Sequence, residues 1–279
     1  MGRTQGHHTG ARPGSAPGDR AEKVVGVLGG MGPLATADFY AKLVRRTPAR
    51  TDQGHLHVII DSNPKIPDRT DGLGGAGPDP TPHLVAAARS LERAGAELIA
   101  MPCNSAHAYL AAIRKAVRVP VLDIMEEVAA AAAARTPRPR AVGLLAAPGT
   151  IRARLYHRAL GARGFEVVDT TPVEEAGVEA AIKAVKAGDL GAGVRRRIRE
   201  TAAALIRRGA DAIVLGCTEL PLVMSAHDVP VPVLDGTDIL AAAAVREARL
   251  KEFSHPRRRS PPASRGHHPK GVPQPARRR

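Results

Sequence analysis

The strongest constraint on the fold is an internal repeat that covers most of the chain. The segment VVGVLGGMGP at 24–33 aligns with AVGLLAAPGT at 141–150. Further along, ERAGAELIAMPCNSAH at 92–107 aligns with IRRGADAIVLGCTELP at 206–221. Two copies of one unit in a single chain predict two structurally equivalent halves.

Each half alternates short apolar runs with helical patterns. VPVLD also occurs in both halves, at 119–123 and 231–235. Buried strands that alternate with helices of about ten to fifteen residues predict an α/β fold, in which parallel sheets carry helices on both faces. The sequence predicts strands at 22–29, 55–60, 96–102, 140–147, 165–169 and 211–216, and helices at 33–46, 82–94, 105–117, 151–162, twice within 173–208, and from 237 to about 251.

The two cysteines, Cys103 and Cys217, occupy the same place in the two copies. Cys103 follows Gly26 by 77 residues and Cys217 follows Gly143 by 74. Each comes after a predicted strand, and ligands bind at the carboxyl ends of strands in open parallel sheets. We therefore expect both thiols in one cleft. Each should lie near a helix N-terminus, whose partial positive charge favours the thiolate.

Four roles are open to such a cysteine pair: a disulfide, a metal site, inert core residues, or chemistry. Two cysteines make no disulfide framework. A metal site would need His107 as a further ligand, and Glu219 stands where the second half would need a match. Inert core residues have no reason to recur in equivalent contexts. The sequence thus favours paired acid–base chemistry, in which a thiolate and a thiol act on opposite faces of a stereocentre.

Charge and composition exclude several other classes of protein. The chain has a net charge of +14, of which +7 lies in residues 252–279, so the body is only mildly basic. It has no Trp and only three Tyr and three Phe, too few for a base-stacking platform. We expect no specific nucleic-acid partner. Residues 1–22 and 252–279 have no hydrophobic period and are predicted to be disordered tails. No membrane helix or signal peptide is apparent, so we expect a cytoplasmic protein with reduced thiols.

Five short motifs together resemble the aspartate/glutamate racemase family, the cofactor-independent amino-acid racemases. They are GVLGGMGPLAT (26–36), NPKIPDRT (63–70), MPCNSAH (101–107), KAGDL (186–190) and GCTEL (216–220). The resemblance implies two Rossmann-like domains related by a pseudo-twofold axis, with the active site in the interdomain cleft. The domains would be 23–118 and 119–235, and the last helix, 236–251, would pack back on the first domain.

The same resemblance implies a function. It identifies Cys103 and Cys217 as the two bases of an isomerase that racemises aspartate first and glutamate second, with no cofactor and no metal, commonly as a homodimer. Arg69 matches an arginine that binds a substrate side-chain carboxylate, a task suited to a guanidinium, and Lys186 matches a lysine with the same task. The other expected substrate-binding residues are Met31, Gly32, Gln53, Asn104, Ser105, Thr150, Thr218 and Glu219.

Other functions stay open at this level. Gly30, Gly32 and Ala35 fit a dinucleotide-binding fingerprint, with Asp61 after the next strand, which would suit an NAD-dependent oxidoreductase. A broad-specificity racemase, a hydantoin racemase, an arylmalonate decarboxylase, a maleate isomerase or a non-catalytic amino-acid-binding protein would each suit the fold.

Purely structural roles are also open to several single residues. Arg69 could close a loop, Lys186 could be a solvated helix end, and Asn104 could only cap a helix. Asp61 and Asp123 could each do no more than cap the segment after their strand.

Overall fold

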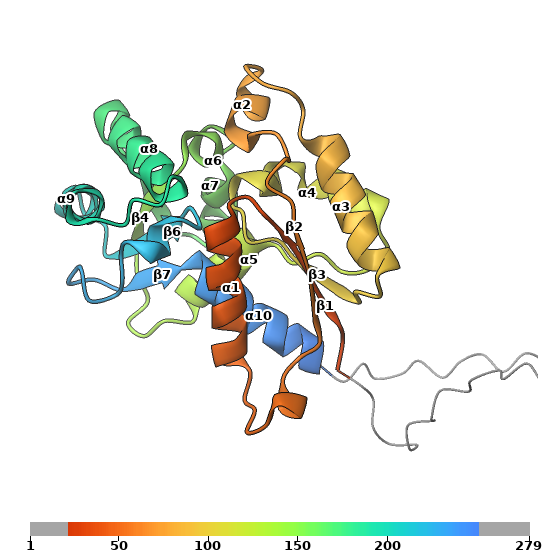
Figure 1. The fold of residues 1–279 in the computed structure, drawn as a ribbon. Coiled ribbons are helices and arrows are strands. Elements are labelled where there is room, and N and C mark those ends of the chain that lie inside the picture. The colour runs from red at the N-terminus through yellow and green to blue at the C-terminus, as the bar shows by residue number, and fades with distance from the viewer. Residues whose placement is uncertain (1–21, 251–279) are drawn as a thin grey trace, which may run out of the picture.

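The protein has an α/β architecture built on two separate parallel sheets. The computed structural model describes residues 22–250, so the tails predicted to be disordered lie outside it except for Glu22. Figure 1 shows the two sheets side by side, with helices on their outer faces and further helices between them. The predicted fold class is confirmed.

The two sheets have equivalent strand orders. The first runs β2-β1-β3 and the second β5-β4-β6-β7, and every pairing is parallel. Val121 makes a single bridge to Ile99 beside β3, where the second sheet has the full strand β7. The predicted repeat is therefore present in three dimensions. The strands are β1 (Val25–Gly29), β2 (Val58–Ser62), β3 (Leu98–Ala100), β4 (Ala141–Ala146), β5 (Glu166–Val168), β6 (Ala212–Gly216) and β7 (Val233–Asp235).

Helices cover both sheets and fill the space between them. In Figure 1, α3 and α4 lie outside the first sheet, α8 and α9 lie outside the second, and α1, α5 and α10 lie in the middle. The α-helices are α1 (Pro33–Arg46), α2 (Arg69–Gly74), α3 (Thr81–Arg93), α4 (Leu110–Ala116), α5 (Ile124–Ala133), α6 (Pro148–Arg152), α7 (Leu155–Gly161), α8 (Pro172–Lys186), α9 (Ala192–Arg207) and α10 (Gly236–Arg249). Short 3₁₀ turns form η1 (Asp52–Gly54), η2 (Ser105–Tyr109) and η3 (Leu220–Leu222).

Helix α10 ties the end of the described chain to its beginning. It packs against α1 and α5, and Ala241, Ala243 and Ala244 on it are fully buried. Alanine side chains allow helices to approach closely. The backbone N–H of Lys23 donates to the carbonyl of Ala248 at 3.0 Å. The central core thus contains strands of both sheets together with α5, α7 and α10.

Two helices were not predicted. Helix α5 is rich in alanine and therefore shows little contrast between apolar and polar positions. Asp123 caps it by accepting from the N–H groups of Met125 and Glu126, as one alternative for this residue foresaw. Helix α2 has a single turn and a half and is capped by Asp68. Asp61 lies inside β2 and does not cap a helix.

None of the helices formed by residues 22–250 combines the length and apolarity needed to cross a membrane.

Candidate active site

Both cysteines lie where equivalent strands end. Cys103 comes three residues after the end of β3, and Cys217 directly follows β6. Both are buried free thiols, 3% and 8% exposed. Strands β3 and β6 occupy equivalent positions beside β1 and β4, so the repeat places the two thiols equivalently, as predicted.

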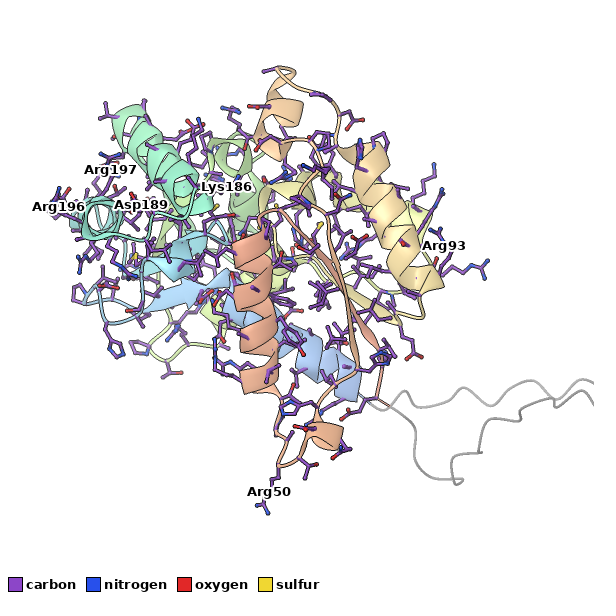
Figure 2. All side chains as sticks on the ribbon, viewed as in Figure 1. Arg50, Arg93, Lys186, Asp189, Arg196 and Arg197 are labelled. Atoms are coloured by element: carbon purple, nitrogen blue, oxygen red, sulfur yellow. The ribbon has the colours of Figure 1, made fainter. Side chains whose placement is uncertain are left out.

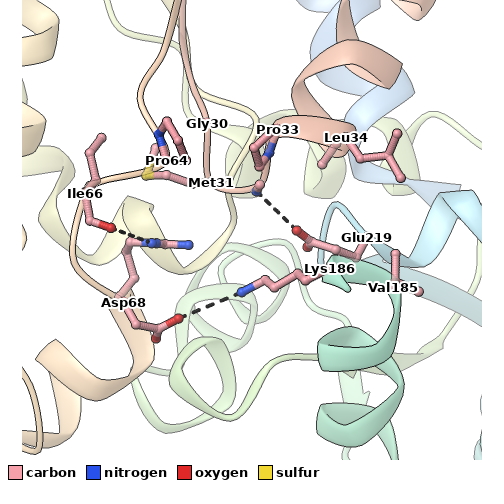
Figure 3. Close-up of a pocket in the computed structure, with 13 residues that line it drawn as sticks. Gly30, Met31, Pro33, Leu34, Pro64, Ile66, Asp68, Val185, Lys186 and Glu219 are labelled. Atoms are coloured by element: carbon pink, nitrogen blue, oxygen red, sulfur yellow. Dashed lines mark hydrogen bonds and ion pairs between the residues drawn. The ribbon is translucent and has the colours of Figure 1, made fainter. Parts of the chain in front are cut away.

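Two polar contacts cross between the halves at the carboxyl ends of the strands. The backbone N–H of Gly32, before α1, donates to Glu219 Oε1 at 3.2 Å. Lys186 Nζ, at the end of α8, lies 3.8 Å from Asp68 Oδ2, before α2. Figure 3 shows both contacts among the residues that line one cavity. Loops from the two halves therefore meet here through residues of four of the quoted motifs.

A cavity of about 330 Å³ opens between these contacts. Five of the expected substrate-binding residues line it: Met31, Gly32, Arg69, Lys186 and Glu219. Neither cysteine lines the cavity. Each interacts with a residue that does: Cys217 Sγ contacts Glu219, and Cys103 interacts with Arg69.

Cys217 is held as a thiol. Its Sγ donates to Glu219 Oε2 at 3.0 Å, and Thr218 Oγ1 donates to the same oxygen at 3.3 Å. Burial raises the pKa of Cys217 well above its usual value, and the charge and hydrogen bond of Glu219 raise it further, against the opposing charge of Lys186. Both effects favour the protonated thiol form of Cys217.

Cys103 has different neighbours. Its Sγ lies 3.8 Å from Ser105 Oγ. Arg69 is close enough that, although burial acts to lower the pKa of this arginine, the charges of Cys103, Asp68 and Glu219 raise it overall. One cysteine thus lies beside a cation and the other beside a carboxylate.

The expected helix N-terminus is present after Cys103, where the 3₁₀ turn η2 runs directly into α4. After Cys217 the chain forms only the short 3₁₀ turn η3, so the expected helix is reduced there to a single turn. Asn104 precedes η2 but makes no capping hydrogen bond with its side chain. Its Oδ1 instead accepts from Tyr156 Oη at 2.6 Å, so its role is not limited to a helix cap.

Arg69 is buried at the cavity wall. Part of its guanidinium group contacts its own loop, and part of it has no hydrogen-bond partner. Its Nη1 donates to the carbonyls of Ile66 at 3.3 Å and Pro67 at 3.1 Å, which confirms that it helps to close its own loop. Its Nε has no partner. Two further buried groups near the cysteines also lack partners: Asn104 Nδ2 and Thr150 Oγ1. Thr150 lies on α6, which packs against α2 and η2. Buried polar atoms without partners are costly in the absence of a ligand.

Comparisons with known proteins agree with this geometry. The family model for Asp/Glu/Hydantoin racemase matches residues 28–244. The chain belongs to this family. It is 30% identical over 233 residues to the broad specificity amino-acid racemase RacX of Bacillus subtilis, covering 80% of this chain and 96% of that protein. The fold matches Picrophilus torridus aspartate racemase with a TM-score of 0.73 at 30% identity, covering 82% of this chain and 96% of the other. An aspartate racemase homologue from Pyrococcus horikoshii OT3 matches with a TM-score of 0.64 at 28% identity, covering 81% and 99%.

Family membership confirms the resemblance drawn from the motifs and places the chain among the isomerases, because its relatives are racemases. It also agrees with the contacts at α1, where a dinucleotide would have to bind. Glu219 Oε1 accepts the N–H of Gly32 at the start of this helix, the position that a pyrophosphate occupies in dinucleotide-binding folds. A carboxylate there repels phosphate, so the NAD-binding alternative does not fit.

Gln53 does not line this cavity. It lies exposed in η1, beyond the C-terminal end of α1, whereas Gly32 lies before the N-terminal end of the same 14-residue helix. Figure 2 shows Arg50, three residues earlier, at the lower tip of the molecule and away from Lys186. The family resemblance implied that Gln53 contacts substrate, but the length of α1 separates it from Gly32 and the cavity.

His107 does not face a metal site either. Both of its ring nitrogens contact backbone groups: the carbonyl of Cys103 and the N–H of Ile124.

Asp68 and Tyr156 were not among the expected site residues. Asp68 lies in the quoted NPKIPDRT motif, so the sequence could have identified it as a site residue. Tyr156 reaches Asn104 only through the packing of the two halves, which no local pattern reveals.

Proposed function

We propose that the protein racemises an acidic amino acid, aspartate first and glutamate second, by proton transfer at Cα between Cys103 and Cys217, without a cofactor. The observation that carries this proposal is the equivalent placement of the two thiols at the ends of β3 and β6, beside a cavity bridged by both halves. A racemase of this kind needs one proton acceptor and one proton donor on opposite faces of the substrate.

The different surroundings of the two sulfurs support a starting assignment. In the substrate-free enzyme, Cys217 carries a proton that it shares with Glu219, and Cys103 lies near the Arg69 cation. The Cα–H bond breaks as an S–H bond forms on Cys103. The S–H bond of Cys217 breaks as a new Cα–H bond forms on the opposite face. The product enzyme holds the proton on Cys103, which is the form that accepts the opposite enantiomer.

Substrate recognition follows from the charges around the cavity. Arg69 and Lys186 supply positive charge for the side-chain carboxylate. The unpartnered Asn104 Nδ2 and Thr150 Oγ1 are polar atoms suited to bind the α-carboxylate. Glu219 and Asp68 supply negative charge for the α-ammonium group. Ser105 and Thr218 flank the thiols and orient them.

A second candidate function is racemisation of a broad range of amino acids. The cavity wall includes the apolar side chains of Met31, Leu34, Ile66 and Val185, which suit neutral side chains, and the relative from B. subtilis is described as a broad specificity racemase. Both candidate functions use the thiols of Cys103 and Cys217. They differ in whether Arg69 selects substrates with an acidic side chain.

Substitution of Arg69 separates the two candidates. We expect Arg69→Ala to lower kcat/KM for aspartate on the order of 100-fold more than kcat/KM for methionine, because a buried charge-assisted contact to the side-chain carboxylate is lost, whereas loss of the cation beside Cys103 affects both substrates alike. Arg69→Lys keeps the charge but not the two-pronged geometry, and should recover only part of the loss. Equal losses for aspartate and methionine would show that Arg69 does not select acidic substrates.

We further propose that the enzyme is a homodimer, as the family resemblance implies. Light scattering coupled to size-exclusion chromatography measures this directly. A mass near twice the 29.2 kDa of the chain supports the dimer, and a mass equal to that of one chain contradicts it.

A further inference from the structure

We propose that His107 is a positioning residue for Cys103, which it connects to the first turn of α5 through a fixed, neutral imidazole. The inference rests on the proposed function in one respect, that Cys103 is a base. Its geometric part stands independently of that function. Nothing in the family comparison assigns a role to this residue.

The hydrogen bonds determine the tautomer of the ring. His107 Nδ1 lies 2.9 Å from the carbonyl oxygen of Cys103, and a carbonyl can only accept. Nδ1 therefore carries the proton. His107 Nε2, 3.2 Å from the backbone nitrogen of Ile124, must then accept that N–H. A charged imidazole could not make the second contact, because it has no acceptor.

The surroundings keep the ring neutral. His107 is 6% exposed. Burial lowers its pKa, and the positive charge of Arg114 acts in the same direction, while Asp123 and the backbone groups of Cys103 and Leu122 oppose the shift without reversing it. The lowered pKa and the hydrogen-bond geometry therefore both favour the neutral ring that makes both contacts.

The contact to α5 satisfies a group that would otherwise lack a partner. The first N–H groups of a helix have no intrahelical acceptor. Asp123 accepts from the N–H groups of Met125 and Glu126, which leaves Ile124 for His107. Ile124 is fully buried in the central core. The Cys103 peptide is thereby anchored to the packed centre of the molecule and not to a surface loop.

The second half has no such anchor. In the repeat, His107 aligns with Pro221, which has no side-chain donor or acceptor. Cys217 is held through its sulfur by Glu219, whereas Cys103 is held through its carbonyl by His107. The imidazole therefore positions one thiol of the pair and leaves the Cys103 sulfur free of a carboxylate partner.

Two variants of His107 each keep one of its two hydrogen bonds and remove the other. In His107→Asn, the side-chain amide can donate to the Cys103 carbonyl but cannot reach Ile124. In His107→Gln, the side-chain carbonyl can accept from Ile124, but the donor to Cys103 is lost. Each variant loses one buried hydrogen bond, so a purely structural role predicts similar losses of stability and activity. Asp123→Ala is the matched control, because it removes the α5 cap without touching Cys103.

The first readout is chemical and needs no substrate. Full-length protein is treated with iodoacetamide, and alkylation rates at Cys103 and Cys217 are followed by peptide mass spectrometry. We expect His107→Gln to change the Cys103 rate relative to Cys217 by about tenfold, on the scale of misplacing a reacting group. We expect His107→Asn and Asp123→Ala to leave the ratio near that of the wild type. Racemisation should show a matching fall in kcat with little change in KM for His107→Gln alone.

The outcomes separate the inference from the function. Equal effects of the Asn and Gln variants, or an unchanged ratio in His107→Gln, would overturn the positioning role. A wild-type protein that fails to racemise any amino acid would refute the proposed function, and the alkylation ratio would still decide the role of His107. If the variants do not fold, long-range ¹H–¹⁵N NMR of the wild-type ring decides the matter. A neutral Nδ1–H tautomer is the expected result, and an Nε2–H or charged ring contradicts the proposal.

Discussion

Glu219 is the residue that most clearly distinguishes the two cysteines. Its carboxylate accepts from the Cys217 thiol through one oxygen and from the Gly32 N–H through the other. It therefore stabilises the protonated form of one thiol and contacts the opposite half of the molecule at the same time. Cys103 has no carboxylate within hydrogen-bonding distance of its sulfur among the described contacts.

We predict that Glu219→Gln moves the alkaline limb of the kcat/KM profile to lower pH. The free enzyme needs Cys217 as a thiol, and the limb reports loss of that proton. The Glu219 charge contributes to the raised pKa of Cys217, so removing the charge lets the thiol ionise earlier as pH rises. Initial rates over a series of pH values measure the shift. Glu200→Gln, at an exposed glutamate of α9, is the control. An alkaline limb that stays in place or moves upward would contradict the assignment.

At the scale of elements, the contact between α2 and α6 places Arg69 and Thr150 near each other. Gly149 makes this approach possible, because a Cβ at this position would lie 2.8 Å from Thr70 Oγ1 and 3.0 Å from Thr70 Cα. The second distance is to a backbone atom, which cannot move away by a change of rotamer as a flexible side chain can. The two short helices can therefore only come together over a glycine.

We predict that Gly149→Ala lowers kcat/KM by about tenfold or more, because displacing α2 moves Arg69. Gly161→Ala is the matched control, since a Cβ there meets nothing within 4 Å, and it should leave activity unchanged. Steady-state kinetics of the two purified variants make the comparison. Similar kinetics for both would mean that the α2–α6 contact does not position the site.

A buried hydrogen bond from Tyr156 on helix α7 to Asn104 links this helix to the segment that follows Cys103. We predict that Tyr156→Phe lowers the free energy of unfolding by about 1–3 kcal/mol, because Asn104 Oδ1 is left buried without a donor. Urea denaturation followed by circular dichroism gives the value. Tyr40→Phe, at a tyrosine 43% exposed, should change stability little. A loss no larger than that of the control would rule out this contribution.

The sequence predicted the elements whose pattern is local. Strands β1 to β6 and the helices α1, α3 and α10 follow from continuous apolar runs and from helical periodicity, whereas the three-residue strand β7 was not predicted. Helix α5 was missed because its alanine run shows no amphipathic contrast, and α2 because it is too short for a period to be seen. Cys103 and Cys217 were found because the repeat is visible in the letters. The contact of Cys217 with Glu219 and that of Asn104 with Tyr156 depend on side-chain packing, which no repeat encodes. Gln53 was expected from the family resemblance, but it lies beyond the far end of α1 from Gly32, a separation that the motifs do not reveal.

At the scale of the whole molecule, two equivalent sheets enclose a shared centre. We propose that residues 23–118 and 119–235 form the two α/β domains, with α10 packed on α1 and α5. The cross-half contacts of Gly32 with Glu219 and of Asp68 with Lys186 then lie at the domain boundary. In the two-base mechanism proposed above, each domain would supply one thiol to one face of the substrate.

The most direct test of two-base racemisation is proton NMR of L-aspartate in D₂O with the enzyme and no added cofactor. The wild type should lose the Cα–H signal and produce D-aspartate, while Cys103→Ser and Cys217→Ser should each abolish racemisation. If neither aspartate nor glutamate exchanges, the acidic-substrate proposal is wrong, and the same assay across neutral amino acids tests the broad-specificity candidate. Racemisation that persists in either cysteine variant would contradict the central claim that both thiols are required.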